Sequence, residues 1–217
     1  VAGVGMYLVF SLIIGLTTGV TVVMSQYYGA KEEDKVVKTF FSSIFIALGM
    51  TILVTVIGLL TTRPLLIVLQ TPAEVLDAAV LYLRIICAGS VGTMLYNWIS
   101  AVLRSLGNSV VPLIFLGISS LLNIVFDILF VAVIPLGVGG AAFATVLAQV
   151  ISGVACLLYA WKILPMLRIR RDKLKLDTYI GKQMLVYGLP AALQMSIISI
   201  SDMTLQAVVN TYGTTLV

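Results

Sequence analysis

The sequence contains no histidine and few charged residues of either sign. Charged side chains make up 10% of its 217 residues, whereas soluble domains average about 25%. The absence of histidine removes the commonest metal ligand and the commonest general base, which disfavours metalloprotease and Ser-His hydrolase chemistry. Cysteine is scarce too, and Cys87 and Cys156 both lie within apolar stretches. This setting favours small core residues over a disulfide or a metal-binding pair.

Apolar residues, in contrast, are abundant. Hydrophobic residues make up 60% of the chain, and its mean hydropathy is +1.14. Such a chain has too few polar residues to cover a surface in water, so the composition predicts membrane lipid as its surroundings. The net charge of +4 does not indicate a nucleic-acid partner, because the basic residues cluster in short loops and form no stripe interleaved with aromatics.

Six apolar stretches reach about 20 residues, the length that a helix needs to cross the hydrocarbon core of a bilayer. They cover residues 1–28, 39–60, 78–102, 110–134, 138–161 and 184–210. Each stretch is apolar on all sides and none alternates, which predicts helices and not strands. The sequence therefore predicts an all-α membrane protein with about six transmembrane helices.

Basic residues are distributed unevenly over the connections between these stretches. If successive connections alternate between the two sides of the membrane, eleven of the thirteen Lys and Arg residues fall on one side, and only Arg63 and Arg84 fall on the other. The positive-inside rule then predicts cytoplasmic loops at 31–38, 103–109 and 162–183 in a multi-pass protein of the cell (inner) membrane. We expect the amphipathic residues Leu65–Leu69 to lie at the membrane interface.

The chain does not begin with methionine, and it opens within an apolar stretch that no basic segment precedes. We therefore expect Val1 onward to belong to a longer protein and not to a signal peptide. The expected partners are membrane lipids and the remainder of that protein.

Asp127 lies in the middle of the apolar segment Leu121–Phe130. An ionised aspartate at membrane depth costs about 2.5–3.5 kcal/mol on insertion scales, so this side chain must face a cavity, a partner or a cation. Asn123 stands one helical turn earlier on the same face. Three interpretations stay open: the two residues ligate a hard cation such as sodium, Asp127 takes up a proton, or the pair forms a structural hydrogen bond.

The last apolar stretch is unusually polar, since Gln194 and Asp202 lie within it. Such a helix face either lines water and substrate or makes hydrogen bonds between helices. Tyr96 and Asn97 in the third stretch and Gln149 in the fifth suit a cavity for flat cationic or amphipathic solutes, and they suit helix packing equally well.

Proline 190 follows Gly188 near the start of the last stretch. This spacing predicts a kink or loosened hydrogen bonding, because proline has no backbone N–H to donate. Kinks in transporter helices often lie near the substrate path, which makes Pro190 a candidate gating residue.

Five segments, in order along the chain, resemble motifs of the multidrug and toxic compound extrusion (MATE) transporters. They are Ser25–Lys31, Ala101–Asn108 followed by Pro112, Leu122–Asp127, Leu136–Thr145 and Gly188–Gln194. The resemblance covers almost the whole chain and assigns it to family helices two to seven of a twelve-helix, two-lobed fold. It implies N-terminal lobe helices at 1–162, a basic cytoplasmic linker at 163–183 and the first helix of the C-terminal lobe at 184–217.

The same resemblance implies a cation site. In the DinF-like branch of the family, an Asn and an Asp one turn apart on the fifth helix and a Thr on the sixth are ligands. These match Asn123, Asp127 and Thr145. A further Asp of the first family helix has no counterpart here.

Three functions remain to be compared. A family member exports a drug or a cationic metabolite in exchange for external sodium ions or protons, with no cofactor beyond that coupling ion. A flippase for lipid-linked oligosaccharides has a similar fold, but it should carry basic residues in its cavity for a pyrophosphate, whereas the charges at membrane depth here are mainly acidic. A membrane-embedded enzyme needs clustered catalytic groups, which the sequence lacks, so we expect no enzyme.

Overall fold

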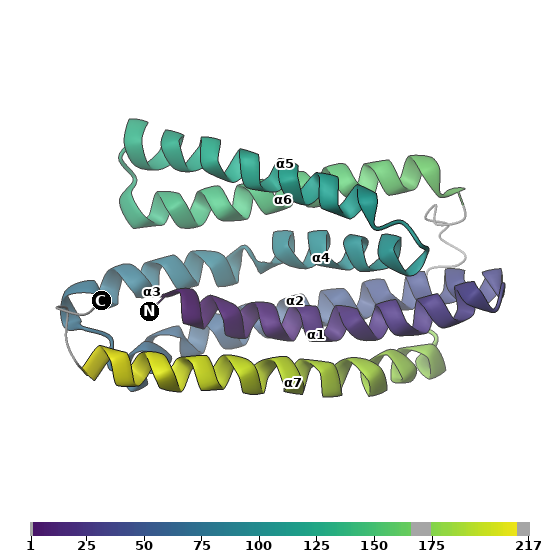
Figure 1. Cartoon of the computed structure of the whole chain (residues 1–217), viewed down its shortest axis with the longest axis horizontal. Coiled ribbons are helices and arrows are strands. Elements are labelled where there is room, and N and C mark those ends of the chain that lie inside the picture. Colours follow the sequence, from purple (N-terminus) through teal and green to yellow (C-terminus); the bar gives the residue numbers. More distant parts are fainter. Residues whose placement is uncertain (1, 166–174, 212–217) are drawn as a thin grey trace.

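The structure, a computed structural model, describes residues 2–165 and 175–211, which form a bundle of helices that lie roughly parallel or antiparallel to one another (Figure 1). Short turns or loops join most of them. The helices are α1 (Ala2–Gly29), α2 (Glu33–Val68), α3 (Ala73–Ala88), α4 (Ser90–Ser105), α5 (Val110–Asp127), the π-helix η1 (Ile128–Val133), α6 (Gly137–Ile163) and α7 (Thr178–Thr211). These described ranges contain no strand, in agreement with the all-α prediction.

The helices are long enough to cross a membrane. Four segments qualify by length and hydropathy, at 33–68, 110–133, 137–163 and 178–202. Helices α3 and α4 qualify together as one span, bent by 48°. Helix α1 has 28 residues, which corresponds to about 42 Å at the rise of an α-helix. The described part of the chain therefore contains four helices that could cross a membrane, or five crossings if the bent pair counts as one; the sixth crossing stays a prediction.

Helix α2 is longer than predicted and continues through Pro64 to Val68. The segment that we expected at the membrane interface, Leu65–Leu69, is the end of this helix and the residue that follows it, and its place in the membrane stays a prediction. Leu66 is fully buried against Ala79, Val80 and Leu83 of α3. The amphipathic pattern therefore reflects packing between α2 and α3.

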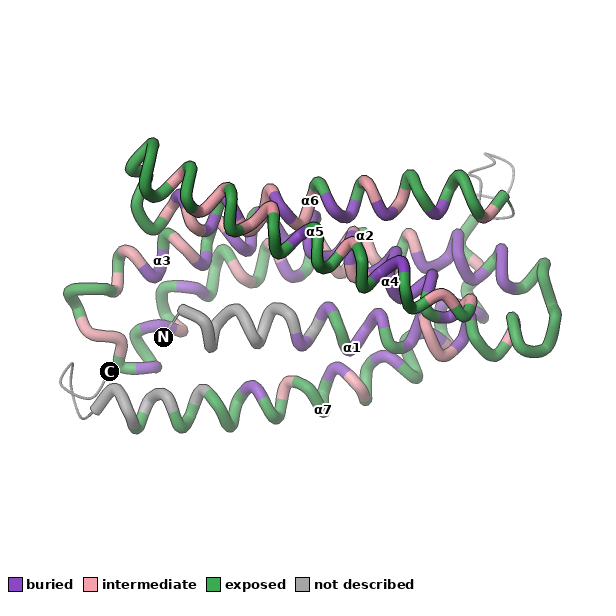
Figure 2. The backbone as a smooth tube through the Cα atoms, turned by 45° about the horizontal axis from the view of Figure 1, so that its top comes forward, coloured by how far each residue is buried: buried purple, intermediate pink, exposed green. Residues whose placement is uncertain are grey.

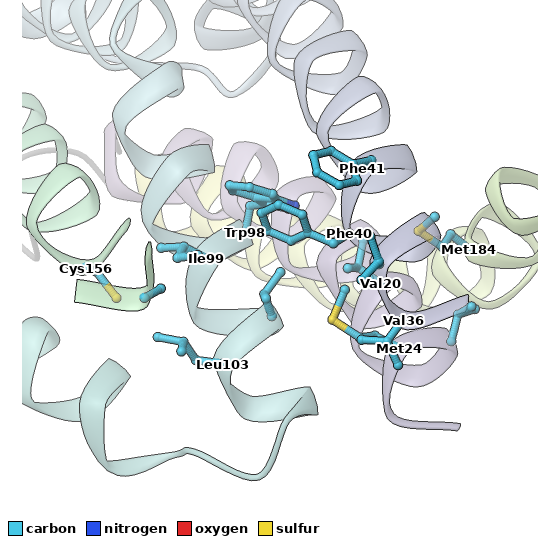
Figure 3. Packing of buried hydrophobic residues seen from close by; sticks show 14 of the residues in the cluster. Val20, Met24, Val36, Phe40, Phe41, Trp98, Ile99, Leu103, Cys156 and Met184 are labelled. Carbon is cyan, nitrogen blue, oxygen red and sulfur yellow. The ribbon is translucent and has the colours of Figure 1, made fainter. Parts of the chain in front are cut away.

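A hydrophobic core joins the ends of α1, α2, α4 and α7 (Figure 3). The Phe40 and Trp98 rings lie 5.3 Å apart between centroids, and the Trp98 indole N–H donates a 2.8 Å hydrogen bond to the Ser43 hydroxyl. Met24 and Met184 bring α1 and α7 into the same cluster. Figure 2 shows the purple, buried residues on the inner faces of the helices, whereas α5 is mostly green and exposed.

Small residues let α1 and α7 approach closely over a long interface. A Cβ added at Gly15 would overlap the backbone of Ala192, and one added at Gly19 would overlap the Met184 carbonyl and Gly188. At the end of the bundle where α7 begins, the Tyr27 hydroxyl donates a 2.7 Å hydrogen bond to the Gln183 side chain. Packing of small residues is the usual way in which membrane helices associate.

The third crossing is broken at Gly89, between α3 and α4, which the sequence reading did not foresee. Thr55 of α2 spans the break: its hydroxyl donates to the Cys87 carbonyl at 3.2 Å and lies 2.8 Å from the Ser90 hydroxyl. A Cβ at Gly89 would overlap the Val146 side chain of α6. The Thr55 hydroxyl therefore provides a hydrogen-bond donor for a backbone carbonyl at the break, and the absence of a side chain at Gly89 lets α6 pack closely.

Candidate functional site

The residues predicted to ligate a cation lie on α5 and α6, where these two helices pack together. Asn123 lies one turn before the end of α5 and donates a 3.3 Å hydrogen bond from Nδ2 to the hydroxyl of Thr145 on α6. The Thr145 hydroxyl in turn donates to the Ala141 carbonyl at 3.1 Å. These bonds leave the Asn123 amide oxygen available to accept a hydrogen bond or to ligate a cation.

Asp127 is the last residue of α5, and η1 follows it directly. Its Oδ1 atom is buried and has no hydrogen-bond partner among the described residues. Asn123 directs its amide nitrogen to Thr145 and not to Asp127, so the structural pair that the sequence left open does not form here. A buried carboxylate oxygen without a partner in the protein is suited to bind a proton, a cation or a water molecule. Single-turn π-helical segments often occur at functional sites.

Tyr82 of α3 is a third contributor, and the sequence reading missed it. The tyrosine lies near Thr145 and Asp127. It lies in an ordinary apolar run, and only the packing of α3 against α6 brings it to the site. No local motif indicates that packing, so the tyrosine could not be identified from its neighbours in sequence.

Aromatic rings line the same end of α5 and α6. Phe126 and Phe130 stack with centroids 5.8 Å apart, and Phe143 of α6 lies 5.5 Å from Phe130. These rings supply an apolar environment close to Asp127. Low polarity strengthens the attraction between a carboxylate and a bound cation.

The two predicted cavity residues of α4 have local partners. Tyr96 is buried and donates a 2.8 Å hydrogen bond from its hydroxyl to the Pro112 carbonyl of α5. Asn97 donates from Nδ2 to the Thr93 carbonyl of its own helix at 2.8 Å. Tyr96 therefore ties α4 to α5, and it is a packing residue in this structure.

The other predicted cavity residues lie on two separate helices. Gln149 follows Thr145 by one turn on α6, and its Oε1 atom is buried without a partner among the described residues. Gln194 and Asp202 are exposed on α7, which packs against α1 and α2 and has no contact with α6 over the described ranges. The structure therefore brings Gln149 close to the cation site but places Gln194 and Asp202 elsewhere.

Helix α7 runs without interruption through Pro190 (Figure 1). The proline removes one backbone donor from the ladder but does not end the helix. Its gating role stays a prediction.

The chemistry available at Asn123, Asp127 and Thr145 is that of one carboxylate with neutral oxygen donors. The described residues contain no group of three or more His, Cys, Asp or Glu side chains that could hold a metal ion. A single carboxylate beside hydroxyl and amide oxygens suits a hard cation of low charge or a proton.

Comparisons with known proteins point in the same direction. The MatE family model matches residues 2–129. A probable multidrug resistance protein, YpnP of Bacillus subtilis, is 35% identical over 94% of this chain and 46% of its own length. An inward-facing MATE family transporter of the MOP superfamily superposes with a TM-score of 0.87 at 25% identity, over 96% of this chain and 48% of that one. An outward-facing form gives a TM-score of 0.84 at 25% identity, over 96% and 46%. The chain thus spans about half the length of the curated relatives that it matches.

Proposed function

This chain belongs to the MatE family, and on that premise we propose that it is part of a secondary antiporter. The proposed protein exports drugs or cationic and amphipathic metabolites in exchange for sodium ions or protons. Its partners are membrane lipids, a small-molecule substrate and the remainder of the same transporter. We assign 1–162 to the first lobe, 163–183 to a cytoplasmic linker and 184–217 to the start of the second lobe.

One observation carries the proposal: Asp127 Oδ1 is buried and unpartnered beside the Asn123–Thr145 hydrogen bond. A buried acceptor of this kind is unfavourable unless it binds something. A cation or proton bound there would neutralise the carboxylate, and its release on the opposite side of the membrane would couple ion flow to a change in conformation.

The substrate path is proposed to include the polar side chains of α7 and α6. Asp202 and Gln194 are exposed on α7, and a carboxylate at membrane depth attracts a cationic substrate. Gln149 supplies an unpartnered amide oxygen on α6. Tyr96 and Asn97 support this path as packing residues, and Pro190 is the proposed gating position.

The test is an ion-driven efflux assay on the full-length protein in liposomes, comparing Asp127→Asn with Asp77→Asn. Asp77 is a matched control, because it is 87% exposed and its nearest ionic partner is Arg63 at 3.7 Å. The Asp127→Asn protein should lose ion-driven efflux while inserting normally, and Asp77→Asn should transport like the parent. Sodium and pH gradients applied separately identify the coupling ion. Full ion-driven transport by Asp127→Asn would overturn the proposal.

A further inference from the structure

Helices α2 and α7 begin at the same end of the bundle (Figure 1). A cleft of about 400 Å³ lies between the beginnings of these two helices. Asp34 and Lys38 line it from α2, and Lys175 and Asp177 line it from the segment that leads into α7. Lys38 and Lys175 thus lie at the same end of the bundle. The cleft is separate from the site at Asp127, and its role does not depend on the proposed transport function.

Hydrogen bonds fix the wall that precedes α7. The Asp177 backbone N–H donates a 2.9 Å bond to the fully buried Ser42 hydroxyl of α2. The Asp177 carboxylate accepts the backbone N–H groups of Tyr179 at 3.1 Å and Ile180 at 3.2 Å. Asp177 therefore caps the first turn of α7 and also holds this turn against α2.

The remaining charges of the cleft are not paired with one another. Lys35, which points elsewhere on α2, forms an ion pair with Glu32. Among the described residues, by contrast, neither Lys38 nor Lys175 has a carboxylate within ion-pair distance, and neither does Asp34, although it stands one turn before Lys38. Within the described ranges, the cleft thus offers two ammonium groups and one carboxylate that have no ionic partner.

The face of α2 that leads away from the cleft is apolar. Asp34 and Lys38 are followed, at steps of three or four residues, by Phe41, Phe45, Leu48 and Ile52. Helical spacing places these residues on one stripe. Phe45, Leu48 and Ile52 are 38%, 54% and 65% exposed. A charged end followed by a long exposed apolar track has the polarity of a phospholipid.

We propose that this cleft binds the headgroup of phosphatidylethanolamine from the adjacent leaflet. Its phosphate would contact Lys38 and Lys175, close to the positive N-terminal ends of α2 and α7. Its primary ammonium would donate hydrogen bonds to Asp34, which a choline headgroup cannot do. The acyl chains then lie along Phe45, Leu48 and Ile52. Among the described residues that line the cleft, two lysines and two aspartates balance in charge, which favours a zwitterionic headgroup over an anionic one.

The experiment is native mass spectrometry of the full-length protein with dioleoyl-phosphatidylethanolamine, -phosphatidylcholine and -phosphatidylglycerol, and with soluble phosphoethanolamine as competitor. The parent should retain phosphatidylethanolamine in preference to the other two lipids. The double variant Lys38→Gln/Lys175→Gln should retain it at least tenfold less, and the control Lys162→Gln/Lys182→Gln, with both lysines exposed outside the cleft, should retain it fully.

A second variant separates the two charges of the headgroup. Asp34→Asn removes the partner of the ammonium, so it should shift the preference from phosphatidylethanolamine towards phosphatidylglycerol. Equal retention of all three lipids by the parent, unchanged retention by the double variant, or displacement of the lipid by soluble phosphoethanolamine at equal concentration would each overturn the proposal. All substituted side chains are exposed, so these variants should fold as the parent does.

Discussion

Asn123 and Thr145 are joined across α5 and α6 by a 3.3 Å hydrogen bond from amide to hydroxyl. This bond links α5 to α6 one helical turn before Asp127, which is the last residue of α5. Tyr82 of α3 also lies near Thr145, so residues of three helices meet at the candidate site.

Replacing Thr145 with Ala should weaken coupling-ion binding, because it removes an oxygen ligand and leaves Asn123 without its acceptor. The loss of a hydrogen bond of this kind is worth about 1–1.5 kcal/mol, or about tenfold in affinity. The half-saturating ion concentration for transport measures it. Thr145→Ser keeps the hydroxyl and should behave like the parent; equal ion dependence in both variants would exclude a role for the hydroxyl.

Replacing Gly15 with Ala should destabilise the protein, because the new methyl group would overlap the backbone of Ala192. Overpacking of this type costs about 1–3 kcal/mol. Gly49→Ala on α2 is the matched control, since a Cβ there meets nothing within 4 Å, and the better helix propensity of alanine should leave stability equal or slightly raised. Thermal unfolding in detergent measures both. A Gly15→Ala protein as stable as the control would contradict the close approach of α1 and α7.

Replacing Thr55 with Val should loosen the break between α3 and α4, because the Cys87 carbonyl and the Ser90 hydroxyl lose their partner. The expected loss is about 1–3 kcal/mol of stability. Thr61→Val on the same helix serves as comparison, since the exposed Thr61 hydroxyl bonds only to the Ile57 carbonyl. Hydrogen exchange around Gly89 should rise in the first variant and stay unchanged in the second; exchange that rises equally in both would point to α2 as a whole.

Cysteines introduced at Lys31 and Lys175 should react with an impermeant thiol reagent from the cytoplasmic side only, because both loops lie at the end of the bundle predicted as cytoplasmic. A cysteine at Arg63 should react from the opposite side. Cys87 and Cys156 are buried and free, and an unsubstituted sample measures their background. Labelling of Lys31→Cys and Lys175→Cys from different sides would refute the topology.

The crossings, their helical nature and their alternation could be predicted from the sequence, because runs of about 20 apolar residues and clustered basic loops are local signals. The break at Gly89 could not, since it depends on Thr55 of α2 and Val146 of α6, far away in sequence. The apolar run hides it. For the same reason the sequence did not show that Leu65–Leu69 continues α2, because an amphipathic pattern does not reveal that α3 covers Leu66.

At the candidate site, the four-residue spacing of Asn123 and Asp127 was enough to predict that both lie on one face of the helix. Thr145 was placed beside them only by family resemblance, and the structure joins it to Asn123. Tyr82 was not identified, because its contribution depends on how α3 packs against α6 and not on any neighbour in sequence.

The glycines of α1 have a consequence for how the chain divides into parts. In sequence, residues 164–177 separate α7 from the helices before it. In space, Gly15 and Gly19 of α1 lie against the backbone of α7 at Ala192 and Gly188, so closely that neither glycine has room for a Cβ atom. A polypeptide ending at Ile163 would expose a backbone-deep furrow along α1, which lipid chains fill less densely than a helix does. The long connection in the sequence lies before α7, but in space α7 packs with the helices that precede this connection. A division of the chain by sequence therefore separates two helices that pack as one unit.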